Sequence, residues 1–486
     1  MGAMMLRPIP LHRRQPRLMA APLAALLLGG CTVGPAFRAP PTGVPARFTA
    51  AATHKAPAWP RRGWWQAFGT PELSRLVAAA RQHNFSVRVA IAQLEIANAQ
   101  VLGAGAPLLP TLSFGASGTY TQSGGAAGGA RAGGLGGAFD QHQYAASFSA
   151  SYELDFWGRN RDALRAARAN AAAAGFNAAT VALTEEAAVA TTYFQALAYA
   201  DQLRAARRNL AAARGLLAQL RAEFAAGVTD APTVAQQAAL VAAEAATLPT
   251  LRSDYRQQVI ALGSLTGRAP EFMHVTGGSL ATVLVPTIAP GLPSSLLTRR
   301  PDLAEARAVL IAANADVRGA IAAFFPTIAL TGSAGWQSAA LNALFIPGSF
   351  LLSAAGSLSQ PLFDGGTLLA NLRVSRAIWR EDVALYQSAV VQAFSDVETA
   401  LTALHYATRQ ERLQARAVAR AREALTAAEA QLRAGVVDIG TVLNAEQTLS
   451  SDETTLISAR LTRLDAAVGL YKALGGGWTR PISKET

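Results

Sequence analysis

Apolar and polar residues alternate between positions 144 and 154. The even positions hold Tyr, Ala, Phe and Leu, and the odd positions hold Ala, Ser and Glu. A period of two is typical of a β-strand whose faces meet different surroundings, so we predict a strand with one apolar face and one small, polar face. After "DFWGRN" the sequence is rich in alanine, with no proline until Pro232. This predicts one helix from about Arg161 to Ala226, on the order of 100 Å long.

Three other segments repeat this two-faced alternation. The four predicted strands are residues 111–121, 143–154, 327–337 and 350–360. Any one of them alone would fit a soluble sandwich with one wet face. About ten residues is also enough to cross a bilayer at a tilt, and aromatic residues gather toward the strand ends, as in interfacial girdles. These aromatic residues are Tyr120, Tyr144, Tyr152 and Trp336.

The chain contains an internal duplication. Residues 84–114 align with residues 300–330 at an offset of 216, and Gly227 aligns with Gly435 at an offset of 208. The offset falls because the first copy carries a longer Gly-rich loop between its strands. Each copy reads as helix, strand, loop, strand, very long helix, tight turn and helix. Heptad spacing, as at Leu203, Leu210 and Leu217, predicts that the long helices pack along coiled-coil-like seams.

The N-terminus has the layout of a secretory signal. Basic "LHRRQPR" precedes apolar "LMAAPLAALLL", and small residues lead to Cys31. The stretch "LGGC" resembles a bacterial lipobox, in which Cys31 would become the first mature residue and carry lipid. In that resemblance, Thr32 in place of Asp favours sorting to the outer membrane. We therefore favour membrane strands over the soluble sandwich.

Four strands are too few to close a membrane barrel. About eight is the minimum, and an open sheet edge in lipid leaves backbone groups unpaired. The barrel must then be shared between subunits. Two copies would give eight strands and three would give twelve, and only the wider barrel leaves a lumen for the Ser and Thr faces to line. The sequence favours three copies. The best candidate for a transmembrane helix contains Asn314, Asp316 and Arg318, which argues against it.

Composition excludes several classes of function. The formal net charge is +12, but four arginines lie within the first thirty residues and the others are interleaved with acids, so nucleic-acid binding is not expected. The six histidines are scattered without metal-ligand spacing, and no HExxH, GxSxG or Walker motif occurs. Glu185 and Glu186 lie within a predicted helix and are expected to be solvated. We therefore expect no enzymatic activity, no cofactor and no metal site.

In combination, six motifs resemble the TolC family of outer-membrane efflux proteins, specifically its lipid-anchored, OprM-like branch that serves RND-type pumps. They are "WWQAFGTPELSRLV", "LDFWGR", "RRPDLAEA", "FFPTIALTGSAG", "PLFDGG" and "AGVVDIGTVLNAEQTLSS", and they span about Trp64 to Leu474. The resemblance implies an α+β membrane protein and a homotrimer. Its twelve-stranded barrel would lie in the outer membrane, continuous with a periplasmic α-helical barrel that has a small equatorial region.

The resemblance also implies a role and partners. The chain would be the exit duct of a tripartite efflux system, passively conducting substrates received from a periplasmic adaptor (membrane fusion protein) and an inner-membrane pump. Phe156, Trp157 and Gly158 would form the bend between pore strand and helix. The expected segments are a signal peptide (1–30), a lipid-anchored segment (31–71), a first repeat (72–267), an equatorial connection (268–300), a second repeat (301–475) and a tail (476–486).

The helix-tip turns and the gate are the expected sites besides Cys31. Gly227, Asp230 and Gly435 are expected to contact the adaptor. The expected gate residues, in the second copy, are Asp438, Gly440, Asn444 and Gln447. Helix capping is the alternative role for both acids, since Asp is a preferred N-cap and Gly a preferred helix end.

Two stripes follow Asp438. The first is polar or small, at Gly440, Asn444, Gln447 and Ser451, and it is expected to face the lumen; the second is apolar, at Val442, Leu449 and Leu456. Family members commonly read like "YLTVLDAQRSL" here, with Leu, Asp and Arg at the first three positions of the polar stripe. We therefore expect a tip that closes more weakly and responds less to divalent cations.

Two other transport functions remain open. A free-standing porin would need no partners, but porins span the membrane with strands alone, whereas this chain spends most of its length on helices. The exit duct of a type I secretion system is the second alternative. The sequence does not identify the exported substrate.

Overall fold

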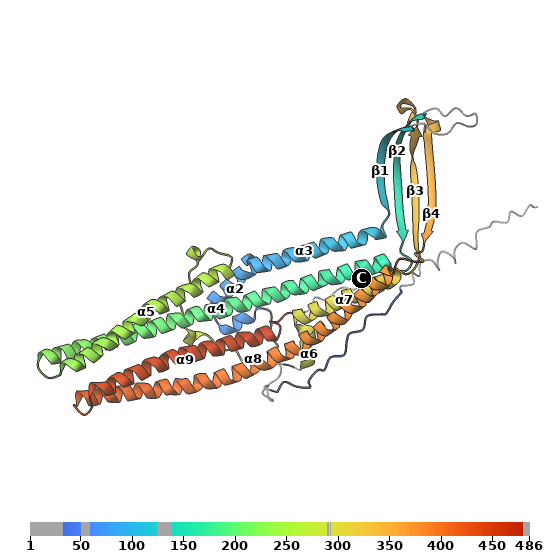
Figure 1. The fold of residues 1–486 in the computed structure, drawn as a ribbon. Helices are drawn as coiled ribbons and strands as arrows, with labels where there is room; N and C mark the ends of the chain where they lie inside the picture. Colours follow the sequence, from blue (N-terminus) through green and yellow to red (C-terminus); the bar gives the residue numbers. More distant parts are fainter. Residues whose placement is uncertain (1–32, 50–58, 124–138, 289–290, 292, 480–486) are drawn as a thin grey trace, which may run out of the picture. The chain divides into compact units, whose positions relative to one another are not determined.

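The computed structural model describes residues 33–49, 59–123, 139–288, 291 and 293–479 (Figure 1). The predicted signal peptide and Cys31 lie outside the described residues. The chain divides into two compact units, and each unit takes segments from both repeats. The sheet unit comprises residues 1–37, 101–167 and 313–379, and the helical unit comprises residues 38–100, 168–312 and 380–486.

The secondary structure follows the predicted order of elements. The helices are α2 (Pro71–His83), α3 (Phe85–Gly105), α4 (Arg159–Ala225), α5 (Ala231–Leu265), α6 (Pro293–Arg299), α7 (Pro301–Ala322), α8 (Thr367–Arg433) and α9 (Ile439–Ala473). The strands are β1 (Thr111–Ser123), β2 (Phe139–Leu154), β3 (Thr327–Ser338) and β4 (Phe350–Ser359). All four predicted strands are present, and α4 is the predicted long helix. Among the described residues, no helix has both the length and the apolar character needed to span a membrane.

The strands form one antiparallel sheet in the order β1-β2-β3-β4 (Figure 1). The register of the sheet places residues of similar polarity next to one another on adjacent strands. An apolar row runs across the strands as Phe114, Phe148, Ala334 and Leu352. The neighbouring row on the other face is entirely serine: Ser113, Ser149, Ser333 and Ser353. The alternation predicted within each strand is therefore in phase across the sheet, which has one apolar and one small, polar face.

The apolar face is uncovered in the single chain. Leu112 is 73% exposed, Phe114 is 61% exposed and Leu352 is 74% exposed. On the polar face, the hydroxyl oxygens of Ser333 and Ser353 lie 2.8 Å apart. Contiguous exposed apolar surface of this kind marks a region that contacts lipid or protein.

The predicted bend between β2 and α4 is built by side chains that pack and cap. Gly158 has φ of 85°, a left-handed conformation that suits glycine. The Trp157 indole N–H donates to the Pro326 carbonyl at 2.8 Å, and its ring stacks on Phe325. The Asp155 carboxylate accepts from two N–H groups in the first turn of α4, those of residues 160 and 161. These contacts fix the direction in which the helix leaves the strand.

The core of the helical unit lies where α2, α4, α5 and α9 meet. Phe68, Phe194 and Leu464 are fully buried there. Trp64 stacks on Tyr471, with ring centroids 5.1 Å apart. The predicted heptad seam of α4 is buried at Leu210 and Leu217.

The duplication extends to the backbone packing of the helical unit. After α5, Gly267 has φ of 66°, and a Cβ there would lie 2.2 Å from the carbonyl oxygen of His83. After α9, Gly475 has φ of 84°, and a Cβ there would lie 2.2 Å from the carbonyl oxygen of Arg299. Each pair occupies equivalent positions of the two repeats. Each long hairpin therefore ends at a glycine whose backbone packs directly against the end of an earlier helix.

We expect Gly475→Ala to destabilise the helical unit by at least about 2 kcal/mol, because it combines a left-handed conformation with a backbone clash. Chemical denaturation followed by circular dichroism measures this loss. Gly215→Ala is the matched control, because Gly215 is an exposed position inside α4 with open space around it. That variant is expected to be neutral or stabilising. Equal losses in the two variants would contradict the seating role of Gly475.

Candidate functional site

The two hairpin turns have the same backbone design. In the first, Gly227 has φ of 75° and its N–H donates to the Phe224 carbonyl at 3.0 Å. In the second, Gly435 has φ of 69° and its N–H donates to the Leu432 carbonyl at 2.9 Å. The residue after each glycine donates back to the carbonyl five residues earlier, which completes a Schellman-type helix end. The predicted helix-ending glycines therefore lie in both turns.

Both tip acids cap the helices that follow them. The Asp230 carboxylate accepts from the Thr233 N–H at 3.0 Å, and the Asp438 carboxylate accepts from the Thr441 N–H at 3.0 Å. The hydrogen bonds from Thr233 hold the pKa of Asp230 below its ordinary value. The capping alternative thus describes the geometry that these two acids adopt in the single chain.

The polar stripe that follows Asp438 points away from the packed interior of the chain. Asn444, Gln447 and Ser451 are exposed, and Gly440 is half-buried. Val442, on the apolar stripe, is fully buried. This side of α9 is therefore free to line a surface formed with other molecules.

A small apolar cluster joins the two hairpins near their turns, where they lie side by side (Figure 1). Leu220 of α4, Ala428 of α8, and Ile439 and Val442 of α9 are buried together. Val234 of α5 packs against this cluster. The two hairpins of a chain are therefore packed against each other at this end.

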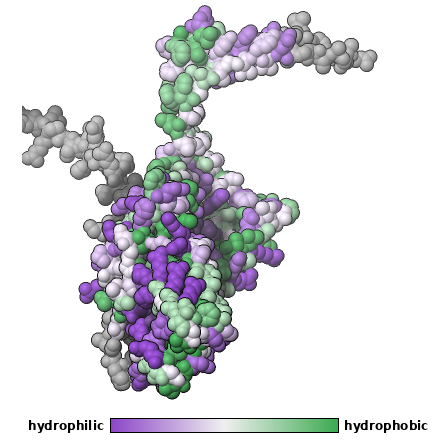
Figure 2. Space-filling model, turned by 90° about the vertical axis from the view of Figure 1, so that its left-hand side faces the viewer, coloured by the Kyte–Doolittle hydropathy of each residue, from purple (hydrophilic) through white to green (hydrophobic). Residues whose placement is uncertain are grey.

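The outer surface of the turns carries exposed apolar residues. Val228 is 75% exposed and Val436 is 72% exposed, at equivalent positions of the two turns. Figure 2, which looks onto this end of the hairpins, shows hydrophilic residues gathered between smaller hydrophobic areas.

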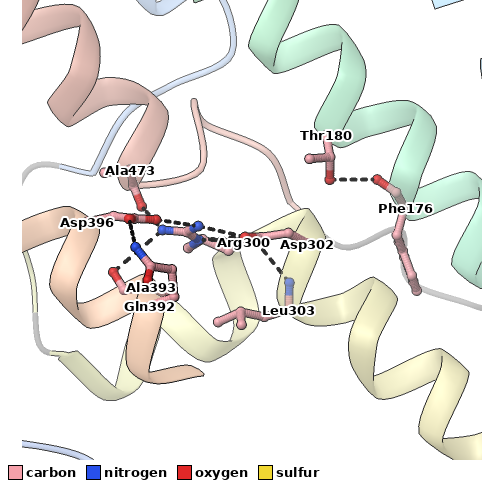
Figure 3. Close-up of polar contacts among 9 residues, drawn as sticks. All are labelled: Phe176, Thr180, Arg300, Asp302, Leu303, Gln392, Ala393, Asp396 and Ala473. Carbon is pink, nitrogen blue, oxygen red and sulfur yellow. Dashed lines mark hydrogen bonds and ion pairs between the residues drawn. The ribbon is translucent and has the colours of Figure 1, made fainter. Parts of the chain in front are cut away.

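Arg300 joins three helices of the helical unit (Figure 3). Its guanidinium donates to Asp302 in the first turn of α7 at 2.6 Å and to Asp396 of α8 at 3.0 Å. It also donates to the carbonyl of Ala473, the last residue of α9, at 3.2 Å. Burial opposes the charge on Arg300, but the two carboxylates outweigh it and raise the pKa of Arg300. We name Arg300, Asp302 and Asp396 the arginine latch.

The first repeat has a neutral counterpart of this latch. Asn84 stands at the position equivalent to Arg300, and its amide donates to the Leu265 carbonyl at 2.9 Å, at the end of α5. The same amide donates to Glu185 of α4 at 2.9 Å. In each repeat, one side chain thus links the end of a helix to a long helix. This side chain is the Asn84 amide in the first repeat and the buried Arg300 guanidinium in the second.

The expectation that Glu185 and Glu186 are solvated is wrong for Glu186, which is buried, and holds only in part for Glu185, which is half-buried. Glu185 accepts the hydrogen bond from Asn84, and Glu186 is buried and lies 3.3 Å from the Arg81 guanidinium. Burial raises the pKa of Glu186, while Arg81 and Trp64 lower it. These contacts could not be inferred from the position of the two acids within a helix, because their partners lie about a hundred residues away in the sequence.

A second buried acid, Glu411 of α8, was also not predicted from the sequence. Its carboxylate accepts hydrogen bonds from the guanidinium groups of Arg460 and Arg463 of α9, each at 2.8 Å. Arg460 also donates to the Leu280 carbonyl at 2.6 Å. These ion pairs join α8, α9 and the connection between the repeats. Among the residues the structure describes, no three His, Cys, Asp or Glu side chains form a group that could hold a metal ion.

A cavity of about 560 Å³ lies beside the arginine latch. Its lining includes Thr180, Thr184, Gln392 and Lys472. The Gln392 amide donates a hydrogen bond to the Asp396 carboxylate at 2.7 Å, which holds both side chains in place on this wall of the cavity (Figure 3). The latch groups facing the cavity are therefore held by one another.

Similarity to known proteins covers nearly the whole chain. Residues 76–268 and 292–476 match the family model described as "Outer membrane efflux protein". The chain is 37% identical over 457 residues to the pyoverdine export outer membrane protein OpmQ of Pseudomonas aeruginosa, covering 94% of this chain and 96% of that protein. It is 31% identical over 461 residues to the probable outer membrane lipoprotein SilC of Salmonella typhimurium, covering 93% and 97%.

A solved structure shares the fold. The open state of the MtrE outer membrane channel of Neisseria gonorrhoeae superposes with a TM-score of 0.83 at 31% sequence identity. The match covers 92% of this chain and 98% of that channel. The sheet and the paired long hairpins described above are therefore part of a shared architecture.

Proposed function

Because this chain belongs to the outer membrane efflux protein family, we propose that it is the exit duct of a tripartite efflux system. It lies in the outer membrane and extends into the periplasm. It conducts its substrates passively, since members of the family are efflux channels rather than enzymes. A periplasmic adaptor and an inner-membrane pump complete the system.

A homotrimer with a shared twelve-stranded barrel is the second part of the proposal. The observation that carries it is the sheet itself: β1 and β4 are edge strands, and the uncovered apolar face backs onto a face of serine and threonine. Unpaired edges cannot face lipid, so neighbouring chains must cover them. With three chains, the apolar face meets lipid and the polar face lines a water-filled lumen.

The membrane anchor is the third part. Lipid on Cys31 would tether the N-terminus to the outer membrane, and the similarity to a protein named as a probable outer membrane lipoprotein supports this. Mass spectrometry of the mature N-terminal peptide tests it directly.

The hairpin tips form the adaptor contact and the gate. Gly227, Asp230 and Gly435 shape the turns, and the exposed valines beside them suit an apolar contact with the adaptor. Threefold assembly would bring the exposed stripe of α9 around one axis. Asp438, Gly440, Asn444 and Gln447 would then surround the narrowest part of the closed channel, with Asp438 also serving as a cap.

The alternatives have less support. A free-standing porin has no use for the tip hairpins, which account for much of the helical unit. An exit duct of a type I secretion system would share the whole architecture and differ only in its partners. Relatives are named for pyoverdine export and for cation efflux, so the substrate of this chain is set by its own pump.

We expect the purified protein to be a trimer that forms pores. Native mass spectrometry in detergent should give three times the mass of one mature chain, and planar bilayers should show stepwise conductance. Cysteines placed on β1 and β4 should cross-link between chains only. Co-purification with an adaptor separates the exit duct from the porin. A folded monomer in detergent, or a trimer that conducts no ions, would contradict the shared barrel.

A further inference from the structure

A second cavity, of about 470 Å³, lies between α2 and the segment that follows α5. α2 contributes Arg75 and His83 to its lining, and the segment after α5 contributes Arg268 and His274. It shares no lining residue with the cavity beside the arginine latch. Its volume is typical of sites that hold small molecules. Basic side chains from two parts of the helical unit thus border one space.

The lining of this cavity carries a net positive charge. Glu72 is the single acid among its residues, against two arginines, so the sign holds even with both histidines neutral. The Glu72 carboxylate is buried, and it accepts hydrogen bonds from the Thr276 N–H at 2.7 Å and from the Tyr193 hydroxyl at 3.3 Å. Glu271, an acid of the segment after α5, is exposed and does not line the cavity. A negative group that entered the cavity would therefore meet a surplus of positive charge.

The two guanidinium groups are free to bind a ligand. Arg75 and Arg268 are exposed, and neither side chain forms an ion pair or a hydrogen bond with the part of the chain that the structure describes. They are also not needed to cap the nearby helix ends. The Asn84 amide donates to the Leu265 carbonyl at 2.9 Å. The backbone N–H of Arg268 donates to the Gly263 carbonyl at 2.8 Å. A guanidinium offers a planar set of donors that matches a carboxylate or a phosphate group.

The walls of the cavity are held in place by contacts within the chain. The backbone of Gly267 packs against the His83 carbonyl at the end of α2. Further along the same segment, the hydrogen bond between Thr276 and Glu72 joins it to the start of α2. A preformed site loses less free energy to ordering when a ligand binds. The cavity therefore meets one requirement of a binding site without any change in the backbone.

An aromatic ring completes the lining. Phe272 borders the cavity and is 76% exposed. Its backbone is fixed, because its N–H donates to the Ala269 carbonyl at 3.0 Å within the short 3-10 helix Pro270–Phe272. An exposed ring beside two cations suits a ligand that carries both an apolar part and a negative group.

We propose that this cavity binds a small organic anion, whose carboxylate or phosphate group is held by Arg75 and Arg268 and whose apolar part covers Phe272. His83 and His274 border the same space and can donate hydrogen bonds to further oxygens of the ligand. The proposal does not rest on the proposed function, because conduction through a duct requires no bound anion at this place.

Isothermal titration calorimetry of the purified protein tests the proposal, in a neutral detergent and at low ionic strength. Phenyl phosphate and benzoate are the probes, one for each acidic group, and both are expected to bind at one site per chain. Phenol lacks the negative charge and inorganic phosphate lacks the ring, so each should bind at least about tenfold more weakly than phenyl phosphate. The tighter of the two probes identifies the preferred acidic group.

Three variants remove the proposed contacts one at a time. Arg75→Gln and Arg268→Gln each remove a charge-assisted hydrogen bond, and each is expected to weaken the binding of phenyl phosphate about tenfold or more. Phe272→Ala should weaken the binding of phenyl phosphate and leave that of inorganic phosphate unchanged. Arg252→Gln is the matched control, because Arg252 is exposed on α5 outside the lining, and it should change the affinity by less than about twofold. All four positions are exposed, so the variants are expected to fold.

A cysteine within the cavity locates the bound probe. Gln82 is exposed and lines the cavity, so Gln82→Cys should react with a neutral maleimide. Phenyl phosphate at about ten times its Kd fills about nine in ten sites, so the rate of this reaction should fall about tenfold. Gln257→Cys is the control, because Gln257 is exposed on α5 outside the lining, and its rate should not change. Mass spectrometry of the peptide that contains each position measures the two rates separately.

Three results of the calorimetry would overturn the proposal. They are a lack of binding by both charged probes, equal affinities for phenol and phenyl phosphate, and equal losses in Arg268→Gln and Arg252→Gln. Binding without protection of Gln82→Cys would place the anion elsewhere and would overturn it as well. None of these measurements depends on pores, an adaptor or a pump, so their outcome is separate from that of the exit-duct proposal.

Discussion

Replacing Arg300 with methionine is expected to destabilise the helical unit by about 1–3 kcal/mol, because two half-buried acids lose the cation that they face. Arg300 is only 9% exposed, and it balances Asp302 and Asp396 at 2.6 and 3.0 Å. Its loss also leaves the last carbonyl of α9 without the donor that now meets it. Chemical denaturation of the purified trimer, followed by helical circular dichroism, gives the size of the loss.

The triple variant Arg300→Met, Asp302→Asn, Asp396→Asn provides the matched comparison. It removes the two negative charges together with the positive one, so much of the stability should return. Arg299→Ala is a second control, because Arg299 is half-buried and its guanidinium lies over the Trp59 ring at 4.7 Å. That change is expected to cost about 1 kcal/mol or less. A triple variant as unstable as Arg300→Met would show that packing, rather than charge balance, makes Arg300 important.

The strands and the long helices were predictable because their patterns are local. Alternation over 144–154 marked β2, and the apolar and polar faces of the sheet follow from the same parity in all four strands. A slip of one residue would exchange the faces of a strand, so the parity also constrains the register. The ends of the hairpins were predictable for a similar reason, since Gly435 and Asp438 carry the signals of a helix end and an N-cap within four residues.

Contacts between distant segments were not predictable. Arg300 reaches partners 96 and 173 residues away, and nothing in "RRPD" distinguishes a buried cation from an exposed one. The same holds for Glu185 and Glu186, which look like solvated positions of an alanine-rich helix.

Helix capping by Asp438 also affects the charge expected at the proposed gate. The Asp438 carboxylate is directed at the N-terminus of α9, where the helix dipole offsets part of its charge. The exposed stripe beyond it, from Gly440 through Asn444 and Gln447, carries no charge at all. On threefold assembly, the α9 stripe would therefore surround the channel axis with neutral side chains.

Asn444→Asp is accordingly expected to change conduction strongly. Asn444 is exposed, and threefold symmetry would place three carboxylates around the axis where the wild type has three amides. Each pair of unit charges interacts by about 1 kcal/mol at 4 Å in water, and more strongly in a confined site. We expect the cation-to-anion permeability ratio, measured from reversal potentials in planar bilayers, to rise about tenfold, which corresponds to about 1.4 kcal/mol. Millimolar divalent cations should block the variant and leave the wild type nearly unaffected.

Gln236→Asp is the matched variant, because Gln236 is exposed on α5 at the position equivalent to Asn444 in the first repeat. Both changes place a carboxylate six residues after a capping aspartate. If α9 alone lines the constriction, Gln236→Asp leaves selectivity and divalent block unchanged while Asn444→Asp alters both. Equal effects would mean that both hairpins line the tip. If both variants behave as the wild type does, the polar stripe of α9 faces away from the lumen, and the constriction must be formed by other residues.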